Sequence, residues 1–399
     1  MGTAEDIRKK AEEYQEYTAE NLSSMVRIPS LSCEEEKVIK EIRRQCEEAG
    51  FDEVRIDGLG NCICRIGRGN KILAFDAHID TVDTGILDQW DENPYSGTVR
   101  DGWVNGRGTV DQEGGAAAMI TAGRILKETG WEGDFTLYFT FTIMEEDCDG
   151  LCWKYIIEEE GIRPDFAVIT EPTNLRITRG HRGRMEMEIF YTGRSAHGSA
   201  PERGDNAVYK AARGILNVEE LHERLKTDPF LGKGSIAVSR VASNGPSLCA
   251  VPDSSSFYVD RRLTWGETLE SAVKEVEDAA GKEGRVTVPE YDRPSYKGTV
   301  FTQEKYFPTW KIPEDHSLVQ QGRETFVRLF RQEPEIDKWT FSTNAVSICG
   351  RFGIPCIGFG PGEESYAHAP NERVQIEHLV KASAFYALLP FTMEERTDG

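Results

Sequence analysis

The chain has 399 residues, 39% of them hydrophobic and 10% aromatic, enough to bury a large core and a usual length for two domains. Its formal net charge of -21 argues against nucleic acid or another polyanion as a partner. The chain contains no run of about 18 apolar residues, so the sequence predicts no membrane-spanning helix. The segment 4–20 is typical of a charged amphipathic helix rather than an apolar signal region. We therefore expect a cytoplasmic protein that binds neither membrane nor nucleic acid.

The nine cysteines form an odd set without paired C-x-x-C spacing, which predicts reduced and mostly buried thiols. Cys148 and Cys152 follow Glu146 closely along the chain. For these two residues, a sulfur ligand to a metal is the alternative to simple burial.

In chain order, Ser32-Cys33-Glu34-Glu35 has the spacing of a capping box and precedes a helix predicted to end at Gly50. Apolar strands are then predicted over 72–77, 135–144, 166–169 and 355–359, and helices over 116–127, 151–159 and 376–389. This alternation indicates an α/β fold with a mixed central sheet flanked by helices. In this class, functional residues lie in loops just beyond the carboxyl ends of strands.

From residue 182 to 289 the pattern changes to that of a self-contained α+β unit. Met185, Met187 and Ile189 alternate with polar residues, as in a strand with one solvated face. Helices are predicted over 206–223 and 267–280, and further strands over 235–241, 255–263 and 285–288. We therefore predict a first domain made of 1–181 and 290–399, with 182–289 inserted as a second domain.

Five segments each end an apolar run with a residue that can bind a metal: Ala77-His78-Ile79-Asp80, Val110-Asp111, Met144-Glu145-Glu146, Ile169-Thr170-Glu171 and Ala367-His368. Two imidazoles and several carboxylates can hold two divalent ions that share one carboxylate and one water. The metals lower the pKa of that water until hydroxide is available near neutral pH. The segments together predict a two-metal hydrolase site.

Each of these residues taken alone also has a structural interpretation that involves no metal. His78 and Asp80 would face the same side of a strand, which favours a ligand and the carboxylate that orients it, although a structural His in a capped loop has the same pattern. Asp111 could instead cap the helix that follows it. Glu171 precedes Pro172 and could merely initiate a turn.

Glu145 and Glu146 follow an apolar strand, and adjacent residues point in different directions. One of them can therefore bind metal while the other stays free to take a proton from the bridging water. His368 lies in a loop rich in Gly and Pro, where a His is exposed unless a partner holds it.

The inserted segment offers His197, Asn244 and Arg262. A neutral imidazole N–H can stabilise an oxyanion, and an Arg can grip a carboxylate. The alternatives are a turn residue for His197 and, for Arg262, a surface residue or one paired with a nearby acid. None of the three could reach the metals without domain closure.

Taken together, these motifs resemble those of the M20 family of metallopeptidases, over residues of about 78 to 373. The resemblance is carried by His78-Ile79-Asp80, Gly106-Arg107-Gly108 with Asp111, Glu145-Glu146 with Gly150, Glu171-Pro172-Thr173, Ser195-Ala196-His197 with Gly204 and Asn206-Ala207, and Gly360-Pro361-Gly362 with His368 and Pro370-Asn371-Glu372. The family includes acetylornithine deacetylase, succinyl-diaminopimelate desuccinylase, aminoacylase and glutamate carboxypeptidase.

The resemblance implies that His78 and Glu171 bind one metal, Glu146 and His368 bind the other, and Asp111 bridges them. Glu145 would then be the general base. It also implies that the inserted domain is a lid through which the protein forms a homodimer. His197 would donate to the oxyanion, in the partner subunit or in its own, and Arg262 would anchor a substrate carboxylate.

Glu113 and Asn344 depart from the pattern, because many members have Lys and Asp there. These departures bear on substrate preference rather than on the metal ligands. The sequence from Gly360 to His368 is most similar to that of the selenium-metabolism-linked hydrolase subgroup.

The expected activity is hydrolysis of an amide or peptide bond in a small carboxylate-bearing substrate, an N-acyl amino acid or a short peptide. The ligand types favour zinc first, with cobalt or manganese as alternatives. A rival interpretation is a non-hydrolytic metal-binding protein that retains the fold for ligand binding or oligomerisation. Serine and nucleotide-dependent chemistry are disfavoured, since neither G-x-S-x-G nor G-x-x-x-x-G-K-[ST] occurs in the chain.

Overall fold

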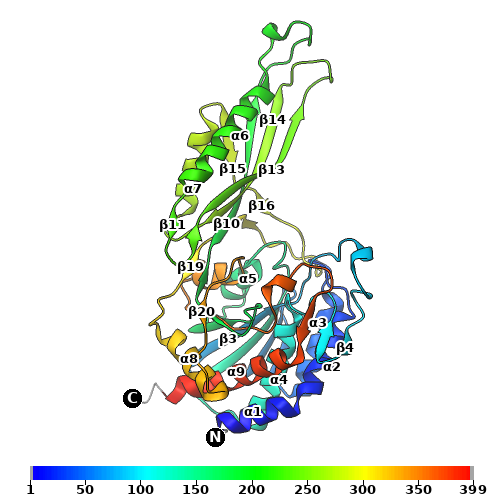
Figure 1. The fold of residues 1–399 in the computed structure, drawn as a ribbon, viewed down its shortest axis with the longest axis vertical. Helices are drawn as coiled ribbons and strands as arrows, with labels where there is room; N and C mark the ends of the chain where they lie inside the picture. Colours follow the sequence, from blue (N-terminus) through cyan, green and yellow to red (C-terminus); the bar gives the residue numbers. More distant parts are fainter. Residues whose placement is uncertain (1–2, 396–399) are drawn as a thin grey trace.

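The computed structural model describes residues 3–395 and has two parts that follow one another along its long axis (Figure 1). The broader part holds both ends of the chain, and the narrower part is formed by the middle of the sequence. Residues 1–2 and 396–399, which the predicted first domain includes, lie outside the described residues.

The broader part, called the large unit below, is built on one mixed sheet of eight strands in the order β1-β2-β6-β3-β7-β21-β8-β20. Their bounds are β1 (Glu53–Ile56), β2 (Cys62–Ile66), β3 (Lys71–His78), β6 (Phe135–Thr142), β7 (Phe166–Ile169), β8 (Ile177–Thr178), β20 (Ile336–Asp337) and β21 (Cys356–Gly358). Strand β3 runs parallel to β6 and β7, whereas β1, β2 and β6 are antiparallel neighbours. The predicted α/β class with a mixed central sheet is confirmed.

Helices pack against the sheets of both parts of the protein and close their cores. The α-helices within residues 3–395 are α1 (Ala4–Glu13), α2 (Gln15–Val26), α3 (Glu36–Ala49), α4 (Glu113–Glu128), α5 (Leu151–Glu158), α6 (Ala207–Arg224), α7 (Leu269–Ala280), α8 (Ser317–Phe330) and α9 (Ile376–Glu395). Short 3-10 turns span η1 (Leu87–Gln89), η2 (Pro201–Arg203) and η4 (Glu364–Tyr366), and a π-helix spans η3 (Val346–Arg351). Helix α4 packs on β3, and α9 packs on α4. Across the described residues, no helix combines the length and apolar character needed to cross a membrane.

Two predictions near the N-terminus are wrong. The single helix expected over 4–20 is two helices, which meet at Tyr14. The predicted capping box is absent: α3 has Glu35 at its N-cap position, and no side chain caps it. Gly50 does end α3 as predicted, in a left-handed conformation with φ 84° that suits glycine.

The narrower part, called the small unit below, has a sheet in the order β13-β14-β10-β15. Its strands are β10 (Gly183–Thr192), β13 (Ser235–Asn244), β14 (Ser254–Leu263) and β15 (Gly284–Thr287), with β18 (Tyr306–Phe307) also paired to β10. Alternate residues of β10 are buried against α6 and α7 in a core separate from that of the large unit. Strand β18 lies beyond the predicted domain boundary at 289.

The remaining strands form small sheets: β4 (Thr98–Arg100), β5 (Trp103–Asn105) and β22 (Arg373–Gln375) in one, β9 (Gly180–His181) with β19 (Trp310–Lys311), β11 (Thr227–Asp228) with β12 (Gly232–Lys233), and β16 (Glu290–Tyr291) with β17 (Gln303–Glu304). In the first of these, Asn105 at the end of β5 is opposite Arg373 at the start of β22. The loop after β5 and the loop before β22 therefore meet.

Parallel pairing brings the strand ends of the large unit to one edge. His78 in β3 is paired with Thr142 in β6, and Asp76 with Ile169 in β7. The residues that follow these strands, Glu145 and Glu171 among them, leave the sheet beside His78. The sequence predicted this placement from the strand ends.

Helix α4 approaches the end of β7 so closely that only glycine fits at Gly115. A Cβ there would overlap the Thr170 side chain and lie 2.8 Å from its carbonyl oxygen. We predict that Gly115→Ala lowers the free energy of unfolding by about 1–3 kcal/mol, through overpacking. Denaturant titration measures this change. Its sign tests the prediction, because a Gly→Ala change at an unconstrained helix position would instead raise the free energy of unfolding by about 1 kcal/mol.

Candidate metal centre

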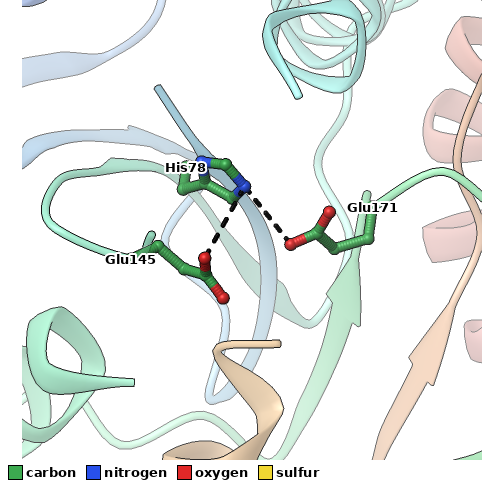
Figure 2. Close-up of side chains that lie close together, drawn as sticks. All are labelled: His78, Glu145 and Glu171. Carbon is green, nitrogen blue, oxygen red and sulfur yellow. Dashed lines mark ion pairs between the residues drawn. The ribbon is translucent and has the colours of Figure 1, made fainter. Parts of the chain in front are cut away.

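His78 is the centre of the cluster of candidate ligands. It ends β3, is buried, and points its Nε2 atom toward Glu145 and Glu171 (Figure 2). Nε2 lies 3.4 Å from Glu171 Oε1 and 3.8 Å from Glu145 Oε2. It also lies 2.9 Å from Asp111 Oδ1. Three segments distant in sequence therefore converge on one imidazole nitrogen.

His368 provides the second imidazole. Its Nε2 lies 3.1 Å from Glu146 Oε1 and 3.2 Å from Asp111 Oδ2. The two oxygens of Asp111 thus face the two histidines separately. The structure brings together all the residues predicted to bind metal, with Glu145 among them.

The donor atoms fit divalent cations. Ligand atoms within 4.8 Å of one another occur in two groups, His78 with Glu145 and Glu171, and His78 with Asp111 and Glu146. Glu145 is thus close enough to be a ligand, although we predicted that it stays unliganded. Among the described residues, the buried Glu145 Oε1 and Glu171 Oε2 have no hydrogen-bond partner. Imidazole nitrogens and carboxylate oxygens with unsatisfied hydrogen-bonding capacity are suitable ligands for divalent metal ions.

Three of the four acidic groups of the cluster are poorly stabilised as anions by protein alone, whereas hydrogen bonds from His368 and His78 lower the pKa of Asp111 despite its burial. Burial and the charge of Asp111 raise the pKa of Glu146 to about 7. Burial, and Asp111 again, raise the pKa of Glu171 to about 8, against the lowering effect of His78. Burial also raises the pKa of Glu145 well above its ordinary value. Hydrogen bonds to Asp111 and Glu146 raise the pKa of His368 to about 10.

Asp80 acts on the site differently from the prediction. The His78 Nδ1–H donates to the Asp80 backbone carbonyl at 2.9 Å, whereas the nearer carboxylate oxygen of Asp80 is 3.6 Å away. The carboxylate instead accepts from the backbone N–H groups of Glu145 and Glu146, at 3.1 Å each. The imidazole tautomer is therefore set by main chain, because a carbonyl can only accept.

Sequence reasoning gave no role to Glu372. This buried carboxylate accepts from the backbone N–H groups of Gly108, Val110 and Asp111 at 3.2, 2.7 and 3.1 Å. It also pairs with Arg107 at 2.6 Å. Glu372 thus joins the loop that carries Asp111 to the loop that carries His368. The motif Pro370-Asn371-Glu372 was visible in the sequence, but its partners were not.

The candidates of the small unit lie outside the cluster. His197 is exposed, with Nδ1 2.8 Å from Ser199 Oγ. Asn244 is exposed at the end of β13. Arg262 pairs with both oxygens of Asp260, at 2.8 and 3.0 Å, which is one of the alternatives considered for it. Within residues 3–395, none of these three side chains makes a hydrogen bond or ion pair to the cluster.

The two departures from the family pattern are both buried. Glu113 begins α4, and burial and the charge of Glu372 raise its pKa well above the ordinary value. Asn344 donates to Asp76 Oδ2 at 2.9 Å, so an Asp at position 344 would place a like charge against Asp76. The amide oxygen of Asn344 accepts from Cys152 Sγ at 3.1 Å, and among the described residues Cys152 belongs to neither group of candidate metal ligands.

This site, on a mixed α/β sheet, defines a metal-dependent hydrolase. The chain belongs to peptidase family M20/M25/M40, whose model matches residues 74–391 and whose members hydrolyse amide and peptide C–N bonds with two metal ions. The family predicted from the motifs is confirmed, and the subgroup stays a prediction.

Two relatives illustrate the range of sequence identity to this chain. The chain is 51% identical to the uncharacterised protein YgeY of Escherichia coli K12, over 97% of this chain and 96% of the relative. It is 27% identical to acetylornithine deacetylase of Proteus mirabilis, over 81% and 79% of the two chains.

Solved structures share the fold. An M20 family metallo-carboxypeptidase from Sulfolobus solfataricus matches with a TM-score of 0.74 and 16% identity, over 94% of this chain and 99% of that one. The Bacillus subtilis protein YXEP, a dinuclear metal-binding peptidase of the M20 family, matches with a TM-score of 0.70 and 16% identity, over 96% and 99%.

Removing the Glu372 carboxylate should release the Asp111 loop. We predict that Glu372→Gln lowers both the melting temperature and the metal content, since it leaves the buried Arg107 unpaired, a defect that costs about 3–5 kcal/mol. Calorimetry and elemental analysis measure the two effects. The exposed Glu363→Gln is the matched control. Wild-type values for Glu372→Gln would contradict the role of this carboxylate.

Stability without metal should fall as the pH rises. The folded state holds protons on Glu171 and Glu146 up to about 8 and about 7, whereas the ordinary glutamate pKa is 4.5. The unfolded chain releases these protons first, so folding loses stability between those limits. We predict that chelator-treated protein melts at progressively lower temperature across this window. Added divalent metal should largely remove the trend, and an equal trend with metal would contradict the ligand assignment.

Proposed function

We propose that this protein hydrolyses an amide or peptide bond in a small carboxylate-bearing substrate, either an N-acyl amino acid or a short peptide. The observation that carries the proposal is the convergence of two imidazoles and four carboxylates at one sheet edge, with the Asp111 oxygens 2.9 and 3.2 Å from the two histidines. Family membership supports the same class of reaction.

We propose the ligand sets that the family resemblance implies, and the contacts of the cluster are compatible with them. His78 and Glu171 would hold one ion, Glu146 and His368 would hold the other, and Asp111 would serve both. When bound, the two divalent ions would lower the pKa of water and polarise the scissile carbonyl. Zinc is our first candidate and cobalt or manganese the alternatives, because the ligands are mixed nitrogen and oxygen donors.

Glu145 is the proposed general base. Its carboxyl lies beside the cluster, and its buried Oε1 has no hydrogen-bond partner among the described residues, so this oxygen is free to accept a proton. Glu145 takes a proton from the attacking water and later passes it to the leaving amine nitrogen. Burial raises the pKa of Glu145 above its ordinary value, which favours proton uptake by this carboxylate.

The predicted inserted domain, residues 182–289, is proposed to act as a lid and as the surface for a homodimer in the cytoplasm. His197 is exposed and therefore accessible to a second active site, as an oxyanion donor. Arg262 would exchange its pairing with Asp260 for a substrate carboxylate, and Asn244 would provide a further polar contact. The relatives support both substrate types, since one is a deacetylase and another a carboxypeptidase.

Replacing the base should separate chemistry from metal binding. We predict that Glu145→Gln abolishes hydrolysis while leaving two metal ions bound, because the amide cannot take the proton. Steady-state rates and elemental analysis measure the two properties, with the exposed Glu159→Gln as the control. An active Glu145→Gln enzyme would overturn the assignment of the base.

Metal removal tests the reaction class. We expect chelated protein to lose activity on acetyl amino acids and dipeptides, and added zinc, cobalt or manganese to restore it. The ratio of rates on the two substrate types decides between a deacylase and a peptidase. Metal binding with no amide hydrolysis at all would support the non-hydrolytic alternative.

A further inference from the structure

The turn after β6 has an uncommon backbone. Met144 adopts a φ of 62°, in the left-handed region, directly before Glu145 and Glu146. A bulky residue in this region costs about 1–2 kcal/mol, so the conformation persists only where its surroundings hold it. The turn matters because it sets the different directions of the two glutamates.

Two buried carboxylates hold this turn by three consecutive backbone N–H groups. The Met144 N–H donates to Glu35 Oε1 at 3.1 Å. The N–H groups of Glu145 and Glu146 donate to the two oxygens of Asp80, also at 3.1 Å each. The orientation of the turn therefore depends on where Glu35 and Asp80 are fixed.

The segment before α3 fixes both carboxylates. Ser32 Oγ donates to Asp80 Oδ2 at 2.6 Å, and Glu35 Oε1 also accepts from the Cys33 N–H at 2.8 Å. The segment runs beside the end of β3, where the Thr81 N–H donates to the Ser30 carbonyl at 2.9 Å. Ser32 and Glu35, the residues expected to cap a helix, are thus committed to the framework of the metal centre.

We propose that Ser32 and Glu35 are positioning residues that hold the turn bearing Glu145 and Glu146. Neither touches the predicted ligand atoms, and both act through the Met144 backbone and the Asp80 carboxylate. The catalytic part of this inference rests on the proposed function, because it assumes that Glu145 is the base. The structural part concerns Glu146 and metal affinity, and it does not depend on hydrolysis.

The property needed at Glu35 is a hydrogen-bond acceptor rather than a charge. Its Oε1 receives both backbone bonds, and its buried Oε2 has no partner among the described residues. Burial and the nearby Asp80 raise the pKa of Glu35 to about 8. An amide oxygen can replace Oε1, whereas the thioether of Met fills the volume without accepting strongly.

The decisive comparison is Glu35→Met against Glu35→Gln, at saturating metal and with a small amide substrate. We expect kcat to fall by about 10–100-fold in Glu35→Met with KM little changed, the usual effect of losing an outer partner of a metal site. Glu35→Gln should restore most of the loss. The neighbouring, exposed Glu34→Met is the matched control and should behave as wild type. Wild-type kcat in Glu35→Met, or equal losses in both Glu35 variants, would overturn the proposal.

Calorimetric metal titration provides a readout without catalysis. We expect Glu35→Met to weaken binding of one of the two ions by about 10-fold, because Glu146 is on the same turn. Should Glu35→Met fail to fold, Ser32→Ala removes only the hydroxyl on Asp80 and should weaken the same ion. Unchanged titrations in every folded variant would overturn the positioning role. A wild-type protein that binds both ions but hydrolyses no amide would instead overturn only the proposed function.

Discussion

The structure depends on keeping buried negative charge at one edge of the sheet. Burial of a carboxylate costs several kcal/mol, in order of magnitude, unless a partner compensates for it. The large unit buries Asp80, Asp111, Glu145, Glu171 and Glu372 close together. Backbone N–H groups and Arg107 compensate Asp80 and Glu372, so these two serve the framework. Glu145 and Glu171 each keep a buried oxygen without a hydrogen-bond partner among the described residues, and the Asp111 carboxylate contacts the two histidines, so these three carboxylates line the candidate metal site.

The parallel strands supply the ligands, and the framework carboxylates align them. The register of β3, β6 and β7 brings His78 and the segments that carry Glu145 and Glu171 to the same edge. Strand pairing fixes positions along the edge but leaves the loops beyond free to vary. Asp80 and Glu372 remove that freedom by binding runs of backbone N–H groups in two separate loops. In this protein, the loops that carry the candidate ligands are thus held in place by further buried carboxylates, Asp80 and Glu372.

The strand-end ligands were predictable because each follows a local apolar run, and their types together identify the chemistry. The supporting contacts were not. Ser32 and Glu35 have the spacing of a helix cap, yet their partners lie 48 and 109 residues further along the chain. The pairing of Glu372 with Arg107 spans 265 residues. A local motif cannot distinguish a neighbour in sequence from one brought near by folding. Asp80 is a second example. The sequence predicted that it lies beside His78, but not that its backbone carbonyl, rather than its carboxylate, accepts from the imidazole.

The pairing of β5 with β22 has a consequence for how the protein is made. It joins the Asp111 loop to the segment that carries His368 and Glu372, close to the end of the chain. A nascent polypeptide therefore lacks His368, one of the three proposed ligands of the second ion, until the ribosome has also synthesised the small unit, which lies between Glu146 and His368 in the sequence. We expect the second ion to bind only after that point, because Asp111 and Glu146 alone offer fewer protein ligands than such ions usually have.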